Sequence, residues 1–359
     1  MKKRVLALVL SSAMVLAGVV GCAAPAEEAA PAEEATTEAP AEEAEAPAGD
    51  LTIGISVDFS FASRLATVKG LEQAGEAAGV DMIEMEANGD AQKQNDQINE
   101  LINKGVDGLL ICPVDLNTIK SALMAAEEAK IPVALYDRDS PDATNVLTAV
   151  TCGATDDGYV GGKYIADELA KQGLDKYVIA ELRGPANDDI GVQRSAGFNK
   201  AIEEVLGDKA EVVVVETGAW EADVATANLS AALQANPDIC AVFCGTDSFF
   251  PGVETALSEV GKQFNVGEEG HVVVTGINGE RAAYDAITAN IADGTVVMNC
   301  PTTGVKTMEA LLAFINDGTK PERTIIVPST FYTIADIEEN KDNIWGCWPQ
   351  EDLALSYNK

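Results

Sequence analysis

Apolar residues recur along most of the chain with two alternating periods. Short runs rich in β-branched residues alternate with longer segments in which apolar residues recur every three or four positions. In the segment 63–78, one helical face carries Leu65, Val68, Leu71 and Ala74. This alternation is typical of parallel sheets that helices cover on both faces, so it predicts an α/β fold.

The predicted elements form two βα series, one after the other. In the first series we expect strands at 51–57, 82–86, 108–112, 133–136 and 145–151, and helices at 63–78, 90–104 and 117–129. In the second we expect strands at 177–182, 210–216, 239–244, 271–276 and 296–300, and helices at 158–173, 189–206, 222–235, 248–261, 280–289 and 303–317. Two strand-like segments follow, at 324–327 and 331–335. So many strands favour two sheets that face each other across a hinged cleft, with the ligand site at the carboxyl ends of the strands.

The first residues have the pattern of an export signal. Lys2, Lys3 and Arg4 precede an apolar run, 5–20, which is too short and wrongly flanked for a stable membrane span. The run ends in Leu-Ala-Gly-Val-Val-Gly-Cys, which resembles a bacterial lipobox with Cys22 as its lipid-bearing cysteine. The resemblance implies a signal peptide over 1–22 and a mature protein anchored outside the cytoplasmic membrane. The alternative is an ordinary secretory signal with a chance cysteine.

The segment 23–50 is almost entirely Ala, Glu and Pro, with eight glutamates and no aromatic or branched aliphatic residue. Such a composition has nothing to bury and cannot offset the entropy lost on ordering. We therefore expect a disordered acidic tether that holds the folded part away from the membrane.

Charge and cysteine content exclude several functions. The formal net charge of −34 opposes binding to nucleic acid or to anionic lipid. The seven cysteines include no Cys-x-x-Cys pair, and the single histidine, His271, lies far from them in sequence, so we expect no metal site. The motifs Gly-x-Ser-x-Gly, His-Glu-x-x-His and the Walker loop are absent, and no Gly-x-Gly-x-x-Gly follows the first strand. We therefore expect neither an enzyme nor a bound cofactor.

Five stretches, taken in order, resemble the bacterial periplasmic sugar-binding proteins of the ribose, galactose and xylose type. They are 102–111 (INKGVDGLLI), 133–138 (VALYDR), Asp157 with 161–163 (GGK), 194–198 (RSAGF) and 241–247 (AVFCGTD). The resemblance covers roughly residues 51–340 and depends on the ordered set rather than on any single motif. It implies the type I periplasmic-binding-protein fold, in which two similar Rossmann-like lobes are joined by a three-segment hinge.

This resemblance also implies the domain limits. The N-terminal lobe would comprise 51–155 and 301–327, and the C-terminal lobe 156–300 and 328–359. The chain would pass between the lobes near 153–157, 299–302 and 327–330.

The ligand-binding residues are also assigned by the resemblance. A sugar presents flat C–H faces and a rim of hydroxyls, so a closed site needs aromatic rings and planar polar groups. The candidate residues are Phe59, Phe61, Arg64, Asp137, Arg138, Arg194, Trp220, Thr246, Asp247, Asn278 and Asn299. Asp58 is a weaker candidate. The alternatives are interlobe salt bridges for Asp137, Arg138 and Arg194, a solvated helix start for Arg64 and a loop anchor for Trp220.

Several positions depart from the pattern of the ribose-type proteins. Asn278 stands where they carry an aspartate, Asn299 where they carry a glutamine, and Thr246 and Cys112 where they carry asparagines. These exchanges alter the hydrogen-bonding groups and their reach. The expected ligand therefore extends beyond pentoses and hexoses to polyols, cyclitols, modified sugars or another small polar molecule.

The implied function is that of a monomeric extracytoplasmic lipoprotein that binds a sugar or polyol for the permease of an ABC importer. One alternative keeps the fold but passes ligand occupancy to a chemoreceptor or sensor kinase. A transcription regulator of the same fold is opposed by the export signal and by the lack of a basic DNA-reading segment.

Overall fold

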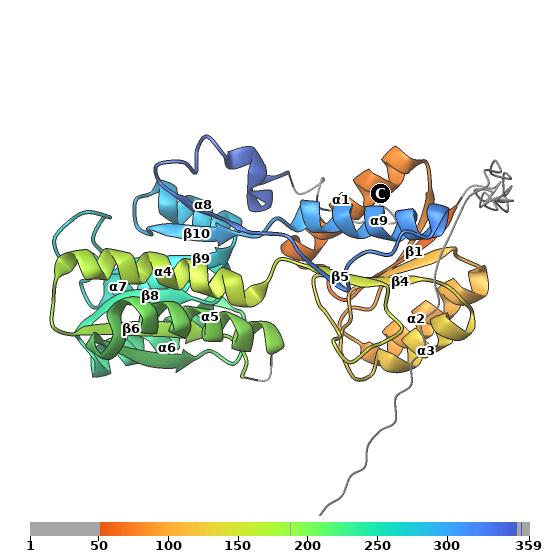
Figure 1. Ribbon diagram of the computed structural model, residues 1–359. Coiled ribbons are helices and arrows are strands. Elements are labelled where there is room, and N and C mark those ends of the chain that lie inside the picture. The colour runs from red at the N-terminus through yellow and green to blue at the C-terminus, as the bar shows by residue number, and fades with distance from the viewer. Residues whose placement is uncertain (1–50, 187, 350–352, 354–359) are drawn as a thin grey trace, which may run out of the picture. The chain divides into compact units, whose positions relative to one another are not determined.

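The computed structural model describes residues 51–186, 188–349 and 353, which belong to one compact unit (Figure 1). The expected signal peptide, Cys22 and the expected tether lie outside the described residues. Within the described part, every helix is too short or too polar to cross a membrane. The fold consists of two lobes, each built around one six-stranded sheet, as the alternating pattern predicts.

The first sheet has the strand order β11-β5-β4-β3-β1-β2, and all of its neighbouring strands are parallel. Its strands are β1 (Thr52–Val57), β2 (Asp81–Glu86), β3 (Gly108–Ile111), β4 (Val133–Tyr136), β5 (Thr148–Thr151) and β11 (Thr324–Ile326). The strands β1, β3 and β4 are buried almost throughout, as is usual where helices cover both faces of a parallel sheet.

The second sheet has the order β12-β10-β9-β8-β6-β7. Its strands are β6 (Tyr177–Arg183), β7 (Ala210–Glu216), β8 (Ile239–Cys244), β9 (Val273–Asn278), β10 (Gly294–Val297) and β12 (Thr330–Thr333). The edge strand β12 pairs antiparallel with β10, and the other neighbours are parallel.

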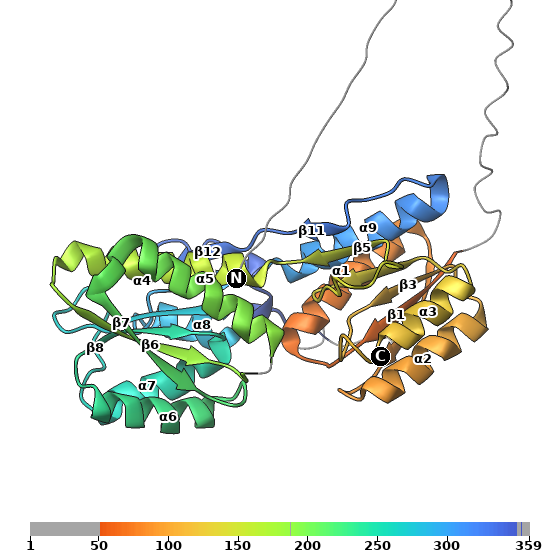
Figure 2. The ribbon, with the colours of Figure 1, turned by 60° about the horizontal axis from the view of Figure 1, so that its bottom comes forward.

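Helices cover the faces of both sheets. They are α1 (Ala62–Ala78), α2 (Ala91–Lys104), α3 (Lys120–Glu128), α4 (Ala154–Gln172), α5 (Asp189–Leu206), α6 (Ala222–Ala235), α7 (Phe250–Glu259), α8 (Arg281–Thr288) and α9 (Cys300–Asp317). Figures 1 and 2 show α1 beside α9 on the first sheet and α4 beside α5 on the second. Local signals set the ends of α2: the Asp90 side chain accepts hydrogen bonds from two first-turn N–H groups, and Gly105 ends the helix at φ 75°.

The chain passes from one sheet to the other at three places. These lie between β5 and α4, between β10 and α9, and between β11 and β12. Because α9 packs against α1, the chain returns to the first sheet after β10 and leaves it again after β11.

The largest errors in the predicted elements lie next to these passages. The segment 296–300 is apolar enough to predict a strand, but β10 ends at Val297 and Cys300 is the first residue of α9. Pro301 lies in the first turn of α9, where its missing N–H costs nothing. Helix α4 begins at Ala154, four residues before its predicted start at Gly158.

The strand predicted at 145–151 is shorter in the structure, because β5 begins at Thr148. Helix α7 is preceded by a short 3₁₀ helix, Asp247–Phe249, so the α-helix starts two residues after the predicted Ser248. Strand β9 lies two residues downstream of the predicted segment 271–276, and it therefore includes Asn278.

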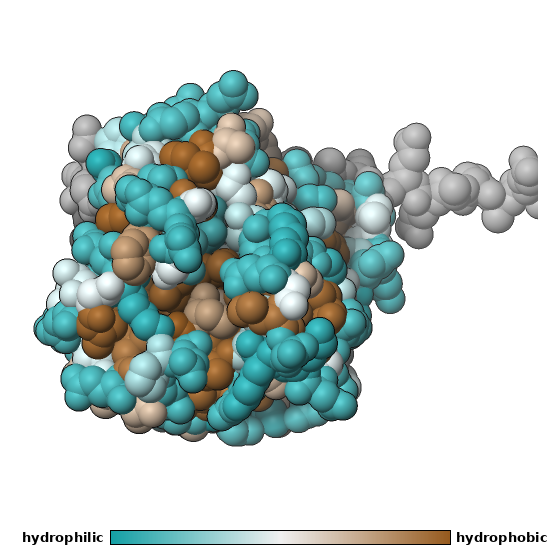
Figure 3. Space-filling model, turned by 90° about the vertical axis from the view of Figure 1, so that its left-hand side faces the viewer, coloured by the Kyte–Doolittle hydropathy of each residue, from teal (hydrophilic) through white to brown (hydrophobic). Residues whose placement is uncertain are grey.

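The surface is largely hydrophilic, as the net charge of −34 requires. Figure 3 shows one face of the molecule, on which hydrophilic residues surround hydrophobic ones near its middle. Scattered exposed apolar side chains of this kind are ordinary for folded proteins.

Candidate functional site

A cavity of about 280 Å³ lies at the carboxyl ends of strands from both sheets. Ligand sites of open parallel sheets are expected at this position. Eight of the predicted site residues line the cavity: Phe61, Arg64, Asp137, Arg138, Arg194, Trp220, Thr246 and Asn278. The sequence analysis therefore names most of the charged and amide side chains that line the cavity.

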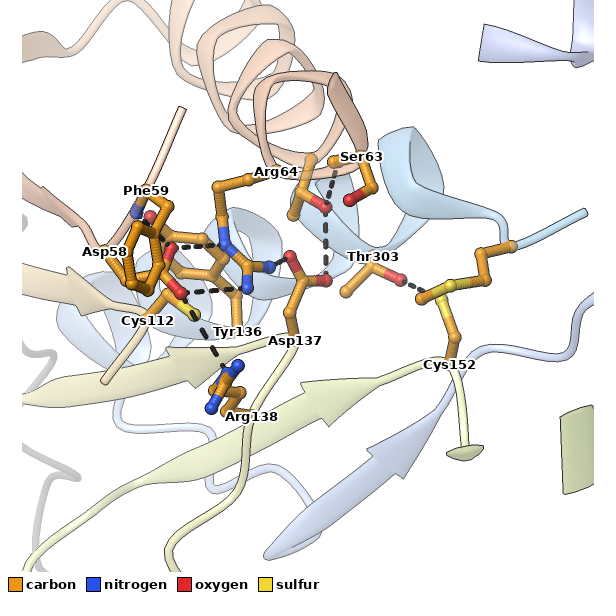
Figure 4. Close-up of polar contacts among 12 residues, drawn as sticks. Asp58, Phe59, Ser63, Arg64, Cys112, Tyr136, Asp137, Arg138, Cys152 and Thr303 are labelled. Atoms are coloured by element: carbon orange, nitrogen blue, oxygen red, sulfur yellow. Dashed lines mark hydrogen bonds and ion pairs between the residues drawn. The ribbon is translucent and has the colours of Figure 1, made fainter. Parts of the chain in front are cut away.

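On the side of the first sheet, the cavity wall is built around Arg64, in the first turn of α1. Its Nε donates to Asp58 Oδ1 at 2.6 Å, its Nη2 donates to Asp58 Oδ2 at 3.1 Å, and its Nη1 contacts Asp137 Oδ2 (Figure 4). Asp58 is fully buried and Arg64 is 8% exposed. Because two carboxylates hold its guanidinium, Arg64 is a fixed part of the wall and supports Asp137.

Asp137 and Arg138 follow β4 directly. Asp137 has a φ of 60°, a left-handed conformation that is costly for a residue with a side chain and is concentrated at functional sites. Thr67 Oγ1 donates to its Oδ1 at 3.1 Å and fixes the carboxylate. Arg138 Nε lies 3.9 Å from Asp58 Oδ2 and has no hydrogen-bond acceptor among the described residues. Buried donors normally have an acceptor, and a molecule bound in the cavity can provide one for Arg138 Nε.

Cys112, which stands where the ribose-type relatives carry an asparagine, lies beneath this cluster. It is fully buried at the end of β3 (Figure 4). Burial raises the pKa of its thiol well above the ordinary value, although the nearby Arg64 acts in the opposite direction. Cys112 is therefore an uncharged packing residue under the wall.

On the side of the second sheet, Arg194 of α5 is the main donor. Its Nη1 donates to the Gly245 carbonyl at 2.7 Å and its Nη2 donates to Asn278 Oδ1 at 2.8 Å. Its Nε is buried without an acceptor among the described residues, and the side chain is 5% exposed. None of these hydrogen-bond acceptors is a carboxylate.

Trp220 follows β7 and presents its ring to the cavity. The ring stacks on Phe249 with centroids 5.9 Å apart, and Nε1 donates to Asp188 Oδ2 at 3.2 Å. Gly184 leaves the space that the ring needs, because a Cβ there would lie 2.1 Å from Trp220 Cη2. Packing against Phe249 and Gly184, together with the hydrogen bond from Nε1, therefore holds the ring in place in the cavity wall.

Asn278, the last residue of β9, adopts a φ of 135°. Its Nδ2 donates to Glu280 Oε1 at 2.7 Å and to Thr246 Oγ1 at 3.0 Å, while Ser248 Oγ donates to Glu280 Oε2 at 2.7 Å. An amide at position 278 thus brings a neighbouring carboxylate, Glu280, into the cavity wall.

Asp247 supports this loop from below instead of lining the cavity. Its carboxylate accepts hydrogen bonds from the backbone N–H groups of Gly279 and Glu280, at 2.6 and 2.9 Å, and from Thr295 Oγ1 at 2.7 Å. Burial, together with Glu280, raises the pKa of Asp247 to about 7. We therefore assign Asp247 as a positioning residue.

Two other predicted residues also lie outside the cavity wall. Phe59 stacks on Phe61, with ring centroids 5.0 Å apart, and its own ring packs against Gly89. Asn299 lies at the passage between β10 and α9, and its Nδ2 donates to the Pro328 carbonyl. Both support the wall or the passages between the sheets.

The sequence analysis missed several lining residues, among them Asp188, Ser248, Glu280 and Met298. Asp188 was accessible from sequence, because an aspartate that caps a helix after a predicted strand must lie at the carboxyl edge of the sheet. Glu280 carries no such signal, since its orientation depends on the conformation of Asn278.

The charges that line the cavity balance. Its acidic residues are Asp137, Asp188 and Glu280, and its basic residues are Arg64, Arg138 and Arg194. Among the described residues, no group of three or more His, Cys, Asp or Glu side chains is arranged to hold a metal ion. With fixed donors, fixed acceptors and exposed aromatic rings, the site can bind a neutral polar molecule with both donor and acceptor groups.

A second cavity, of about 330 Å³, adjoins the first and shares Asp137, Arg138 and Arg194 with it. Asp157 of α4 lines it and is 1% exposed, and its Oδ2 accepts no hydrogen bond from the described residues. Burial raises the pKa of Asp157 to about 6, although Arg194 acts in the opposite direction.

Comparisons with known proteins agree with this geometry. The model of the family "Periplasmic binding protein domain" matches residues 58–320. The ribose import binding protein of Bacillus subtilis (strain 168) is 28% identical over 280 residues, which are 78% of this chain and 86% of that protein. The galactofuranose-binding protein of Escherichia coli (strain K12) is 27% identical over 293 residues, 79% of this chain and 88% of that protein.

A solved structure of a periplasmic ribose ABC transporter protein from Conexibacter woesei has the same fold. Its TM-score is 0.74 at 20% identity, and the match covers 83% of this chain and 96% of that one.

Proposed function

Because this chain belongs to the periplasmic binding protein domain family, we propose that it binds a sugar or polyol in the cavity between its two sheets and delivers it to an ABC importer. The names of the related proteins describe sugar binders, including ribose and galactofuranose binders. The family is described as periplasmic, which supports a place outside the cytoplasm.

The balanced, polar and aromatic wall of the cavity carries this proposal. Three arginines face three carboxylates, so a neutral ligand is favoured over an ionic one. The unsatisfied Nε donors of Arg138 and Arg194 match the acceptor capacity of hydroxyl groups. Trp220 and Phe61 offer the apolar faces on which a sugar ring can stack.

We also propose that the lobes close on the ligand. Arg138 follows a strand of the first sheet and Arg194 belongs to a helix on the second, so one ligand can contact donors of both lobes. Contacts that only the closed form makes with both lobes would shift the population towards that form.

The lipid anchor remains part of the proposal. The lipobox-like sequence before Cys22 and the acidic segment 23–50 support an anchored protein with a tether. Labelling with a radioactive fatty acid tests this part directly. Incorporation should be lost in Cys22→Ala, and equal labelling of this variant would contradict the anchor.

A thermal-shift screen tests the binding function. The chain from Asp50 onward, stripped of bound small molecules, would be screened against pentoses, hexoses, polyols, cyclitols, nucleosides and amino acids. A ligand that binds the folded state alone raises the melting temperature by mass action. A shift with sugars or polyols supports the proposal, whereas shifts confined to nucleosides or amino acids would contradict the ligand class.

A further inference from the structure

Two cysteines lie at two of the three passages between the sheets. Cys152 directly follows β5, and Cys300 is the first residue of α9. Both thiols are free, and the residues are 3% and 0% exposed. Cys300 lines the first cavity and Cys152 the second, but the proposed ligand binding assigns no role to either thiol.

Helix α9 brings these two thiols together. Cys152 Sγ lies 3.3 Å from Thr303 Oγ1, in the first turn of α9 (Figure 4). Cys300 and Thr303 are three residues apart on this helix and therefore share a face. Cys300 therefore lies one helical turn from the hydroxyl that contacts Cys152, and interaction with the Cys152 thiol, together with burial, raises the pKa of Cys300 well above its ordinary value.

The other described cysteines have different surroundings. Cys112 interacts with Arg64 and Asp58, and Cys244 with Asp247. Cys240 donates to the Val178 carbonyl, and Cys347 interacts with Arg281 and Lys341. Their place at neighbouring passages and their interaction thus mark Cys152 and Cys300 as a pair within the described part of the chain.

We propose that Cys152 and Cys300 form a reversible disulfide that ties two of the three passages together. The electron acceptor would be a low-molecular-weight disulfide. A Cys152–Cys300 S–S bond forms, the S–S bond of the acceptor breaks, and the two electrons and two protons leave with the acceptor as two thiols. Disulfides persist outside the cytoplasm, where the family is described to act.

The bond would affect both stability and movement. It closes a chain loop from 152 to 300 that holds β6 to β10, and long loops lose the most entropy from the unfolded state when cross-linked. Lobe movement must be absorbed by changes in backbone dihedral angles at the passages. The bond fixes two of the three passages to each other, so the lobes of the oxidised protein should open and close less freely.

Oxidised glutathione tests the proposal on the full-length protein, first fully reduced. Because thiolates are the attacking species and the pKa of Cys300 is raised, the reaction should be slow and faster at pH 8.5 than at pH 7. After digestion with trypsin, Cys152 lies in the peptide 139–163 and Cys300 in the peptide 282–306, each with a single cysteine. Mass spectrometry should detect these two peptides joined, and reduction should separate them.

Variants provide the controls. The linkage should be absent in Cys152→Ser and in Cys300→Ser, and it should persist in Cys244→Ser, whose thiol is equally buried. The oxidised wild type should melt roughly 5 °C or more above the reduced form. Its amides at 152–157 and 298–303 should exchange hydrogen more slowly.

Three outcomes would overturn the proposal. They are full alkylation of Cys152 and Cys300 after exposure to the oxidant, linkage of either cysteine to another partner, and linkage only after unfolding in urea. None of them depends on a sugar being bound, so this test is separate from that of the proposed function.

Discussion

The ring of Trp220 can form a flat part of the cavity wall because the neighbouring residue, Gly184, has no side chain. A Cβ on Gly184 would lie 2.1 Å from Trp220 Cη2, whereas one on Gly191 would lie 3.3 Å away. The first distance forces the ring to move, and the second is a tight contact that small adjustments absorb. Two glycines next to the same ring therefore offer a graded test of its position.

We predict that Gly184→Ala weakens sugar binding at least tenfold, as Trp220→Ala should, because both remove the stacking face. Gly191→Ala should change the dissociation constant less than threefold. Calorimetric titration with the sugar or polyol identified in the screen measures all three variants. Equal affinity of Gly184→Ala and the wild type would show that the ring does not contact the ligand.

The single-residue roles that the sequence predicts depend on where each side chain points. The resemblance assigns Arg194 and Trp220 to the site, and the structure places both in the cavity wall. Asp247 follows β8 at the carboxyl edge of the second sheet, yet it turns into the protein and binds the N–H groups of Gly279 and Glu280. Sequence places a residue at an edge, but the surrounding packing decides which way it faces.

At the scale of elements, α4 and α5 pack unusually closely. A Cβ on Gly197 would lie 1.9 Å from the Thr155 carbonyl oxygen, and one on Gly158 would lie 2.0 Å from the Arg194 carbonyl oxygen. Glycines at these positions let the helix backbones approach, and this contact places Arg194 at the cavity.

We predict that Gly197→Ala lowers the free energy of unfolding by about 1–3 kcal/mol, because the backbone of α4 cannot yield without disturbing the helix. Urea denaturation measures this change. Glu203→Ala, at an exposed position of the same helix, should stay within about 0.5 kcal/mol of the wild type. A Gly197→Ala protein as stable as Glu203→Ala would contradict the close packing.

The first turn of α4 also predicts a pH dependence. Asp157 has a pKa of about 6 in the folded protein, mainly because of burial, against roughly 3.9 in an unfolded chain. The folded state therefore holds the proton more tightly, and the free energy of unfolding falls as pH rises from about 4 to about 6. Asp247, with a folded pKa of about 7, acts in the same direction.

Asp157→Asn should remove part of this fall, since the amide stays neutral. We expect it to be about 1–3 kcal/mol more stable than the wild type at pH 7 and nearly equal at pH 4. The exposed neighbour Asp156→Asn should retain the wild-type slope. Urea denaturation between pH 4 and pH 7 measures the free energy of unfolding of each protein. If this free energy changed with pH in the same way in Asp157→Asn and in the wild type, the raised pKa of Asp157 would be refuted.

The elements themselves could be predicted wherever local signals agree. The strand at 133–136 and the helices at 189–206 and 222–235 match the structure residue for residue, because the apolar pattern of each segment fits its element. The prediction of a strand through Cys300 was wrong because an apolar run does not distinguish a strand end from the start of a buried helix.

At the scale of the whole molecule, the cavity is a product of topology. Each sheet brings the carboxyl ends of its strands to the same edge, and residues far apart in sequence, such as Arg64, Arg194 and Trp220, line one space. The order of the βα series predicts this arrangement. The chemical identity of the ligand depends on hydrogen bonds, such as those of Asn278 and Glu280, which sequence alone does not place.

The most direct test of the account is a calorimetric titration of two arginine variants with the neutral sugar or polyol from the screen. Arg138→Ala and Arg194→Ala each remove a donor from a different side of the cavity, and Arg183→Ala removes an arginine that pairs with Glu216 away from it. If the ligand contacts both sides, each of the first two variants should bind at least tenfold more weakly, while Arg183→Ala should bind as the wild type does. Unchanged affinity in both Arg138→Ala and Arg194→Ala would place the ligand elsewhere.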